Sequence, residues 1–330
     1  MRILGICDGY SGCSYHRVQS PLKYTEGTKY ITDLPRPEVL EMGFDIITFN
    51  RVSVIDDKFD EVRKITGAKI VVDLDDDWVL PPSHINYDLY VGLKDRIENN
   101  LRNADAVTVT HERLAERVRP FNSNVWIIPN AIPFGVDQYD EEKIPSDKLR
   151  LFWAGGISHV KDIELLRNPM KRISSLPVMT VIGGYNNSNE TSKRLWDGMV
   201  SAFTYGLKIP GMVLTSLPVN EYMNHFSHAD IMLLPLEKTG WHGMKSNLKL
   251  IEAAAKRIPV IVSKVDPYID FNPPVFHVER QKDWFEYVNL FVNNPGMVEL
   301  WGNKLYDWAQ QFSMENVCKK RTECYSSLLK

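Results

Sequence analysis

The chain has 330 residues, of which 44% are hydrophobic and 25% are charged, as in an ordinary globular protein of about two domains. The formal net charge of −3 gives no global signature of nucleic-acid binding, although it leaves room for a local basic groove. Residues 1–145 hold 17 Lys+Arg and 24 Asp+Glu (−7), and residues 146–330 hold 22 and 18 (+4), so the second half is better suited to an anionic ligand.

The four cysteines, Cys7, Cys13, Cys318 and Cys324, lack the spacing of a metal or redox motif, which favours reduced thiols. The opening MRILGICDGY has too short an apolar run for a signal peptide and is typical of a first core strand. No stretch approaches the roughly 18 apolar residues of a membrane span. We therefore expect a soluble cytoplasmic protein, with peripheral membrane contact left open.

Short apolar runs alternate with helical patterns in the first half. The predicted strands are Ile3–Cys7, Asp45–Asn50, Lys69–Leu74, Ala104–Thr110 and Val125–Ile128, and the predicted helices are Tyr15–Tyr24, Lys58–Thr66, Tyr90–Asn103 and Glu112–Val118. This alternation predicts a parallel sheet covered on both faces, with ligands at the carboxyl ends of the strands.

Residues 129–148 contain three prolines and a run of acids without periodicity, which predicts a linker. The strand pattern then restarts at Leu149–Ala154, Pro177–Ile182, Met212–Thr215, Ala229–Leu234, Val260–Val262 and Val275–Val278, before a helical, aromatic tail. We predict an α/β protein with Rossmann-like domains at 1–145 and 146–305 and a C-terminal helix at 306–330.

The loop after the first strand is a candidate acceptor contact. Gly12 permits a tight turn, and Tyr15, His16 and Arg17 follow in the first turn of the next helix. Each alone is more typical of a surface residue, but the cluster indicates substrate contact. His111, after a later strand, is a weaker candidate.

Acidic residues end the strand Lys69–Leu74. Asp73 and Asp75 have DxD spacing, which Mg²⁺ or Mn²⁺ could use, and Asp76 follows. We favour a direct role for Asp75 or Asp76 in gripping sugar hydroxyls or the acceptor, and we expect no required cofactor. Solvated acids that merely end a strand are the plain alternative.

The first loop of the second half is a candidate phosphate site. Gly155 and Gly156 let the backbone approach a ligand, and His159 and Lys161 could then meet its phosphate. Gly183 lies in a similar close-approach turn after the next strand. A strand-to-helix turn with solvated polar residues is the plain alternative.

The stretch GMKSNLKLIEAAAKRIPVIVS (residues 243–263) predicts a polar loop, a short helix and a buried strand. Lys245, Ser246 and Asn247 stand where the helix begins, and exposed N–H groups there favour an anion. Glu252 follows on that helix, and His242 precedes the stretch. A phosphate-bearing ligand is therefore expected here. GxSxG, HExxH, GxxxxGK[ST], CxxC and GxGxxG are absent from the sequence.

Together, IIPNAI before the linker, AGGISHVKD and KSNLKLIEAAAKRIPVIVS resemble GT-B glycosyltransferases of the family 4 type. The resemblance spans nearly the whole chain. It implies two domains facing a cleft, a UDP- or GDP-sugar donor held mainly by the second domain, an acceptor in the first, and retention of anomeric configuration. It also implies that the C-terminal helix crosses back to the first domain.

By this resemblance Lys161 contacts the diphosphate, Glu252 holds the ribose, and Lys245–Asn247 meet the diphosphate through their backbone. Lys161, Lys245 and helix N-termini would then stabilise the departing nucleoside diphosphate. Three departures matter. Met244 stands where the family has its first motif glutamate, and Gly156 stands where it has an arginine, with His159 as a candidate substitute. Asp75 stands where the family often has a histidine, near the end of the strand Lys69–Leu74.

Several alternatives stay open. The same architecture serves sugar-nucleotide epimerases or hydrolases, and Met244 also admits a non-catalytic sugar-nucleotide-binding module. The acceptor could be a glycan, a lipid or a hydroxymethylated DNA base. The oligomeric state is left undetermined.

Overall fold

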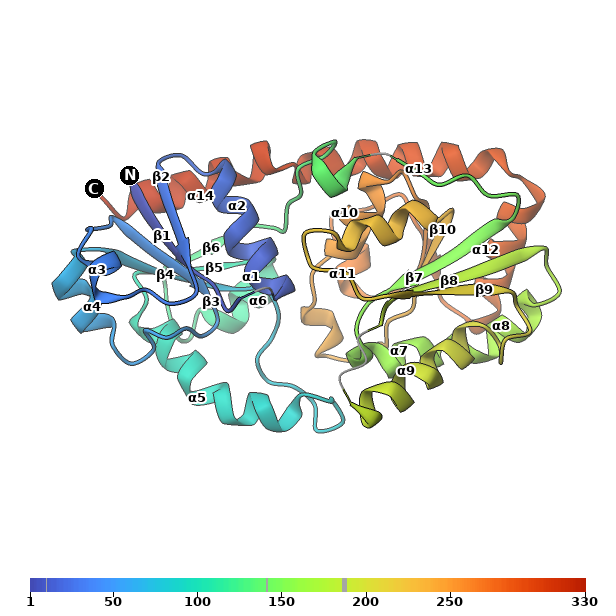
Figure 1. The fold of residues 1–330 in the computed structure, drawn as a ribbon, viewed down its shortest axis with the longest axis horizontal. Coiled ribbons are helices and arrows are strands. Elements are labelled where there is room, and N and C mark those ends of the chain that lie inside the picture. Colours follow the sequence, from blue (N-terminus) through green and yellow to red (C-terminus); the bar gives the residue numbers. More distant parts are fainter. Residues whose placement is uncertain (10, 141, 186–188) are drawn as a thin grey trace. The chain divides into compact units, whose positions relative to one another are not determined.

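The computed structural model describes residues 1–9, 11–140, 142–185 and 189–330. The chain divides into two compact units, each with its own parallel six-stranded sheet (Figure 1). Unit 1 comprises Met1–Pro133, Met244–Ser246 and Gln311–Lys330, and unit 2 comprises Phe134–Gly243 and Asn247–Gln310. No helix within the described ranges is long and apolar enough to cross a membrane.

The sheet of unit 1 has the strand order β2-β1-β3-β4-β5-β6, and neighbouring strands pair in parallel. Its strands are β1 Arg2–Ile6, β2 Thr28–Thr32, β3 Ile46–Asn50, β4 Lys69–Leu74, β5 Ala106–Val109 and β6 Val125–Ile127. Its helices are α1 Gly12–Ser14, a π-helical turn Tyr15–Gln19, α2 Ser20–Tyr24, α3 Pro37–Leu40, α4 Phe59–Thr66, α5 Tyr87–Asn103, α6 Glu112–Val118 and α14 Met314–Ser327. The sequence did not predict β2, because this edge strand is largely exposed and carries no apolar run.

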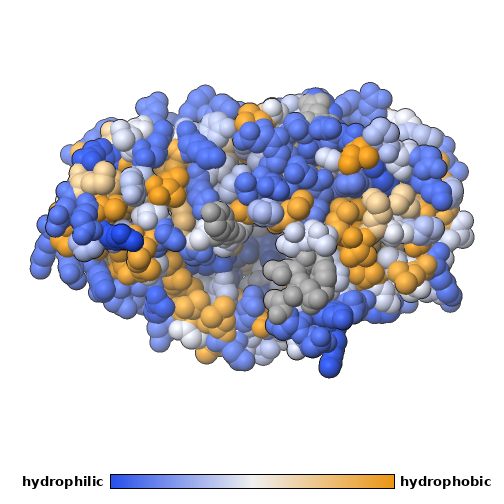
Figure 2. All heavy atoms as spheres, in the orientation of Figure 1, coloured by the Kyte–Doolittle hydropathy of each residue, from blue (hydrophilic) through white to orange (hydrophobic). Residues whose placement is uncertain are grey.

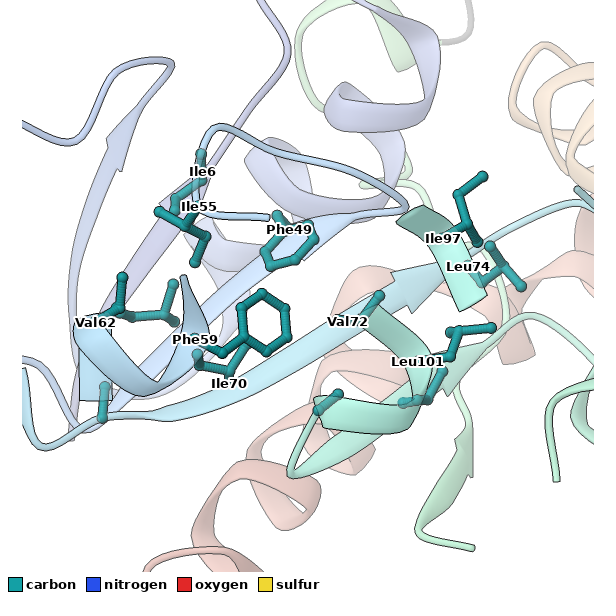
Figure 3. Close-up of a cluster of buried hydrophobic side chains, with 14 of the residues drawn as sticks. Ile6, Phe49, Ile55, Phe59, Val62, Ile70, Val72, Leu74, Ile97 and Leu101 are labelled. Atoms are coloured by element: carbon teal, nitrogen blue, oxygen red, sulfur yellow. The ribbon is translucent and has the colours of Figure 1, made fainter. Parts of the chain in front are cut away.

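Both faces of this sheet are covered by apolar side chains. One face packs against α4 and α5, as Figure 3 shows for Ile6, Phe49, Ile55, Phe59, Val62, Ile70, Val72, Leu74, Ile97 and Leu101. On the other face Ile3 and Ile46 pack with side chains of α2 and α14. Figure 1 shows α14, in red, alongside α2. Burial on both faces explains why β1, β3, β4 and β5 are continuous apolar runs.

The sheet of unit 2 has the order β12-β11-β10-β7-β8-β9, again in parallel pairs. Its strands are β7 Leu149–Ala154, β8 Val178–Tyr185, β9 Gly211–Thr215, β10 Ile231–Leu234, β11 Val260–Ser263 and β12 Phe276–Val278. Its helices are α7 Val160–Glu164, α8 Arg167–Ile173, α9 Glu190–Phe203, α10 Leu248–Ala255, α11 Asp266–Ile269, α12 Gln281–Asn293 and α13 Gly296–Ala309. Short 3₁₀ turns lie at Asp137–Tyr139, Ile157–His159 and Tyr222–His228.

The core of unit 2 is built from β7, β8 and β10 packed with α8, α9 and α12. The visible face in Figure 2 is largely hydrophilic, with separate apolar patches. Aromatic residues of the tail contribute to packing. Trp284 and Phe291 are buried in this core, and Trp301 contacts Phe276 edge-on.

The unit boundaries differ from those predicted from sequence. The first change of unit falls after Pro133, earlier than residue 145, because the predicted linker packs on unit 2. Within it, Gln138 donates a hydrogen bond to the Val219 carbonyl at 3.1 Å and Asp140 pairs with Lys256 at 2.6 Å. Glu141, also within the predicted linker, lies outside the described residues. The last change falls after Gln310 because α13 continues to Ala309 within unit 2.

Candidate functional site

An ionised cluster lies at the carboxyl ends of β3 and β4 in unit 1. The Arg51 guanidinium contacts Asp75 at 2.7 Å and lies 4.0 Å from Asp76, and it also hydrogen bonds to the Tyr90 hydroxyl. Burial acts to raise the pKa of Asp75, but Arg51 and a hydrogen bond from the Cys13 thiol hold it below its usual range. Asp75 is therefore a fixed carboxylate, and the side chain of Asp76, 28% exposed, is the more accessible of the two.

Asp73 has a different environment from Asp75, although the DxD spacing suggested a shared face. Its side chain is fully buried and makes a two-pronged ion pair with Arg17, with both N–O distances at 2.9 Å. Thr108 donates a further hydrogen bond to it at 2.5 Å. The Asp73 carboxylate is thus engaged by interior groups, and the Asn50 amide donates both to Asp73 at 3.0 Å and to Asp75 at 3.2 Å. A metal at this DxD pair stays a prediction.

Arg17 is part of that same interior network. Its guanidinium is 1% exposed and also donates to the Asn130 side chain at 3.0 Å and to the Ile128 carbonyl at 2.9 Å. Arg17 lies in the π-helical turn Tyr15–Gln19 and its side chain is engaged by Asp73 of the central strand β4, so its predicted acceptor contact stays a prediction. The sequence gives no sign of this turn.

The rest of the loop after β1 forms a capped helix start. Asp8 accepts hydrogen bonds from the Ser11 and Ser14 hydroxyls, and the Ser11 hydroxyl caps α1 by accepting from the Ser14 amide. Gly12 opens the helix with empty space where a Cβ would stand. Tyr15 is half-buried against the buried ring of His16, their centroids 5.2 Å apart. Gly12 and Tyr15 thus remain candidates for acceptor contact.

The segment Met244–Ser246 is held by three contacts within unit 1. The Leu114 amide donates to His111 Nδ1 at 3.2 Å, so Nε2 carries the proton and donates to the Met244 carbonyl at 2.9 Å. The Asn130 amide donates to the Ser246 hydroxyl at 2.7 Å. Lys245 Nζ lies 3.7 Å from Asp76 Oδ2. Both ring nitrogens of His111 are thus engaged, which fits a role in positioning Met244, and its predicted acceptor contact stays a prediction.

In unit 2 the turn at Gly155 packs against β8. Gly183 and Gly184 lie within that strand, at an irregularity between Ile182 and Tyr185, so the predicted turn after the strand at Gly183 is wrong. The Gly155 amide donates to the Gly183 carbonyl at 3.2 Å, and Gly184 adopts φ +97°. A Cβ at Gly155 would lie 2.9 Å from the Trp153 ring, and one at Gly183 would lie 3.2 Å from the His225 ring. Gly156 is exposed and has no such crowding. The crowding explains structurally why glycines occupy positions 155 and 183.

Two lysines lie near this turn. Lys249, in the first turn of α10, donates to the Ala154 carbonyl at 2.7 Å, and its Nζ would be 3.5 Å from a Gly155 Cβ. Lys161 has an exposed side chain in the first turn of α7. Lys249 was not among the residues predicted from the sequence; its position three residues before Glu252, on the same helix, is the signal that could have indicated it.

Glu252 is a buried carboxyl group on α10. Burial raises its pKa to about 7, and the charge of Lys249 only partly opposes this. Asn247, at the N-terminal end of α10, is also buried. A glutamate that is 3% exposed and titrates near neutrality is typical of a functional carboxyl group.

Asp162 joins the two histidines predicted near the phosphate. Its Oδ2 lies 2.7 Å from His159 Nδ1, and its Oδ1 lies 3.5 Å from His242 Nε2. Burial raises the pKa of Asp162, but the hydrogen bond and charge of His159 outweigh it, so the pKa is lowered. His159 and His242 therefore belong to one polar cluster of unit 2, after β7 and β10.

No protein-family model matches the chain, and no curated protein matches it in sequence. Solved structures do match. Sucrose-phosphate synthase from Thermosynechococcus elongatus superposes with a TM-score of 0.70 at 14% identity over 99% of this chain and 98% of that one. Anabaena HepE in complex with UDP-glucose gives 0.69 at 11% identity over 99% and 100%.

A UDP-forming trehalose-phosphate synthase from Burkholderia xenovorans gives a TM-score of 0.58 at 12% identity, over 89% of this chain and 75% of that one. Together with the two parallel six-stranded sheets, these matches show that the chain has the GT-B fold, as the sequence resemblance predicted.

Proposed function

We propose that the chain is a glycosyltransferase that moves a sugar from a nucleotide-diphosphate sugar to an acceptor hydroxyl. The observation that carries the proposal is the arrangement around Gly155: a close-packed glycine turn, Lys249 beside it, and the buried carboxyl group of Glu252 one helical turn further along α10. GT-B neighbours solved with UDP-glucose, or with UDP and glucose, support a UDP-sugar as donor.

On the donor side, the ionised form of Glu252 would accept hydrogen bonds from the two ribose hydroxyls. Such donors favour the carboxylate and would lower its pKa when the nucleotide binds. Lys249 and the exposed Lys161 would offset the negative charge that develops on the departing diphosphate. Gly155, Gly156 and Gly183 would admit the nucleotide close to the backbone.

On the acceptor side, Asp76 is the better candidate for contact with a sugar or acceptor hydroxyl, because Asp75 is fixed by Arg51. Gly12 and Tyr15 are further candidates for acceptor contact. Glycan, lipid and hydroxymethylated DNA base all remain candidate acceptors, and retention of configuration remains a prediction from the family resemblance.

The test is a donor-panel assay that measures release of nucleoside diphosphate from UDP- and GDP-sugars, with and without candidate acceptors. We expect acceptor-dependent release, and we expect Lys161→Ala and Glu252→Gln each to lower kcat/KM by about 100-fold, or about 3 kcal/mol. Lys171→Ala, at an exposed lysine of α8, is the matched control.

Full turnover in both variants would refute the assignment of the donor site. Free sugar or an isomerised donor formed without an acceptor would instead indicate a hydrolase or epimerase. Donor binding with no turnover on any acceptor would indicate a binding module.

A further inference from the structure

We propose that Asp162, Glu237 and His242 form a binding site for one divalent cation of the Zn²⁺ or Mn²⁺ type. Asp162 lies on α7, and Glu237 and His242 lie in the loop after β10. The three side chains offer one imidazole nitrogen and two carboxylate oxygens, and these ligand atoms all lie within 4.8 Å of one another. The site is in unit 2 and is separate from the acidic cluster of Asp75 and Asp76 in unit 1.

The separation of the first two ligand atoms fits a shared ion. Asp162 Oδ1 and His242 Nε2 are 3.5 Å apart, and both side chains are buried. Two ligands about 2.1 Å from a tetrahedral ion are about 3.4 Å from each other. The Asp162 and His242 ligand atoms are therefore already spaced as a shared cation requires, and Glu237 lies within reach as a third ligand.

Hydrogen bonds around the cluster orient these ligands. His242 Nδ1 lies 2.7 Å from the Thr239 hydroxyl oxygen, which also accepts from the His242 amide at 3.2 Å. When Nδ1–H donates to Thr239, the lone pair of Nε2 is directed toward Asp162 Oδ1. These two electron-rich atoms repel each other, and both could bind a cation placed between them. Asp162 is held in turn by His159 at Oδ2 and by the Glu237 amide at Oδ1, 2.8 Å away. Such outer hydrogen bonds are usual for metal-ligating histidines and carboxylates.

The ligand chemistry selects the kind of cation. Two carboxylates so close together repel each other, and a divalent charge between them offsets that repulsion. An imidazole ligand favours Zn²⁺ over the oxygen-seeking Mg²⁺ and Ca²⁺, and two carboxylates also suit Mn²⁺. Three protein ligands leave coordination positions open to water or to an anion.

The direct test is calorimetric titration of the full chain, after removal of metals with a chelator, with ZnCl₂, MnCl₂ and MgCl₂ and without any donor. We expect one Zn²⁺ per chain, weaker Mn²⁺ and still weaker Mg²⁺ binding. His242→Ala and Glu237→Ala should each weaken Zn²⁺ binding at least 10-fold, whereas His228→Ala, at a partly buried histidine outside the cluster, should not change it.

Absence of saturable one-to-one binding would overturn the proposal. So would Zn²⁺ binding that is unchanged in both His242→Ala and Glu237→Ala, since the ion would then bind elsewhere. Far-ultraviolet circular dichroism of each variant excludes misfolding as the cause of lost binding. Because this titration contains no donor, its result is independent of whether the chain is a glycosyltransferase.

Discussion

Glu252 places a carboxyl group in a deeply buried position. Burial raises its pKa from 4.5 to about 7, so near neutral pH the side chain is divided between the neutral and charged forms. The charged form is the one that would hold ribose hydroxyls, and it is also the form that burial disfavours. The proposed ligand contact therefore has a cost in the stability of the folded chain.

This cost can be measured with Glu252→Gln. Because the folded-state pKa is above the unfolded value, the folded chain retains its proton more strongly, and stability falls as pH rises from 4.5 to about 7. We expect Glu252→Gln to be more stable than the parent chain at pH 8, by about 3 kcal/mol, and equally stable near pH 4.5. Urea denaturation at both pH values measures the difference.

The control for this substitution is Glu286→Gln, at an exposed glutamate of α12, which should show no such pH-dependent gain. Equal stability of Glu252→Gln and the parent chain at pH 8 would contradict the assigned pKa.

Arg17 is the second residue whose burial has a measurable consequence. Replacing it with Met removes the two-pronged ion pair and leaves the carboxylate of Asp73 buried, with Arg321 as the remaining nearby guanidinium at 4.0 Å. We expect Arg17→Met to destabilise the chain by about 3–5 kcal/mol. Thermal denaturation provides the measurement, and Arg36→Met, at an exposed arginine, is the control. A loss of folding stability below 1 kcal/mol would mean that other groups compensate the buried charge of Asp73.

At the scale of elements, the contact between the Gly155 turn after β7 and the two glycines of β8 depends on backbone conformation and close approach. Gly184 adopts φ +97°, and a Cβ there would lie 2.6 Å from the Gly155 carbonyl oxygen. Gly155 follows β7, Gly183 and Gly184 lie in the neighbouring strand β8, and the Gly155 amide donates to the Gly183 carbonyl.

We expect Gly184→Ala to destabilise unit 2 by more than about 2 kcal/mol, because the added methyl group strains the backbone at this positive φ and meets atoms of Gly155. Gly198→Ala within α9, where a Cβ meets nothing within 4 Å, should instead be neutral or stabilising by up to about 1 kcal/mol. Differential scanning calorimetry of the two variants gives the comparison. Equal melting temperatures for the two variants would show that the backbone around Gly184 accommodates the added methyl group without strain.

The central strands were predictable because each is a short β-branched run buried on both faces, as in β4 and β11. The edge strand β2 was not, since its pairing depends on hydrogen bonds to β1 and not on an apolar pattern. Within the candidate site, motif and spacing predicted Gly155, Lys161 and Glu252, and their roles stay predictions. The contact of Arg17 with Asp73 spans 56 residues and no local pattern encodes it, whereas Lys249 had a local signal in its spacing from Glu252 but not in its contact with Ala154.

At the scale of the whole molecule, unit 1 is completed by the C-terminal segment. In α14, Met314, Cys318 and Tyr325 are buried against the face of the sheet that carries Ile3 and Ile46. The Ile132 carbonyl accepts a hydrogen bond from the Met314 amide at 3.1 Å. Residues from both ends of the chain therefore form one hydrophobic core, whereas unit 2 comes almost entirely from residues 134–310.

This arrangement predicts the behaviour of truncated chains. Deletion of residues 311–330 should expose the apolar face around Ile3 and Val18 and unfold unit 1, while unit 2 keeps its structure. Hydrogen exchange followed by mass spectrometry should show lost protection in β1 and β3 and retained protection in β7 and β8. Deletion of Leu328–Lys330 alone, beyond α14, is the control. Retained protection throughout unit 1 after the longer deletion would contradict the role of α14.

The dependence of unit 1 on α14 also has a consequence for biosynthesis. A ribosome makes the strands of unit 1 first, yet the helix that covers one face of their sheet is made last. Unit 2 is complete in the nascent chain while the first sheet still exposes its apolar face. The half of the protein that is translated first is therefore expected to fold last, and during that interval it is the half most in need of a chaperone.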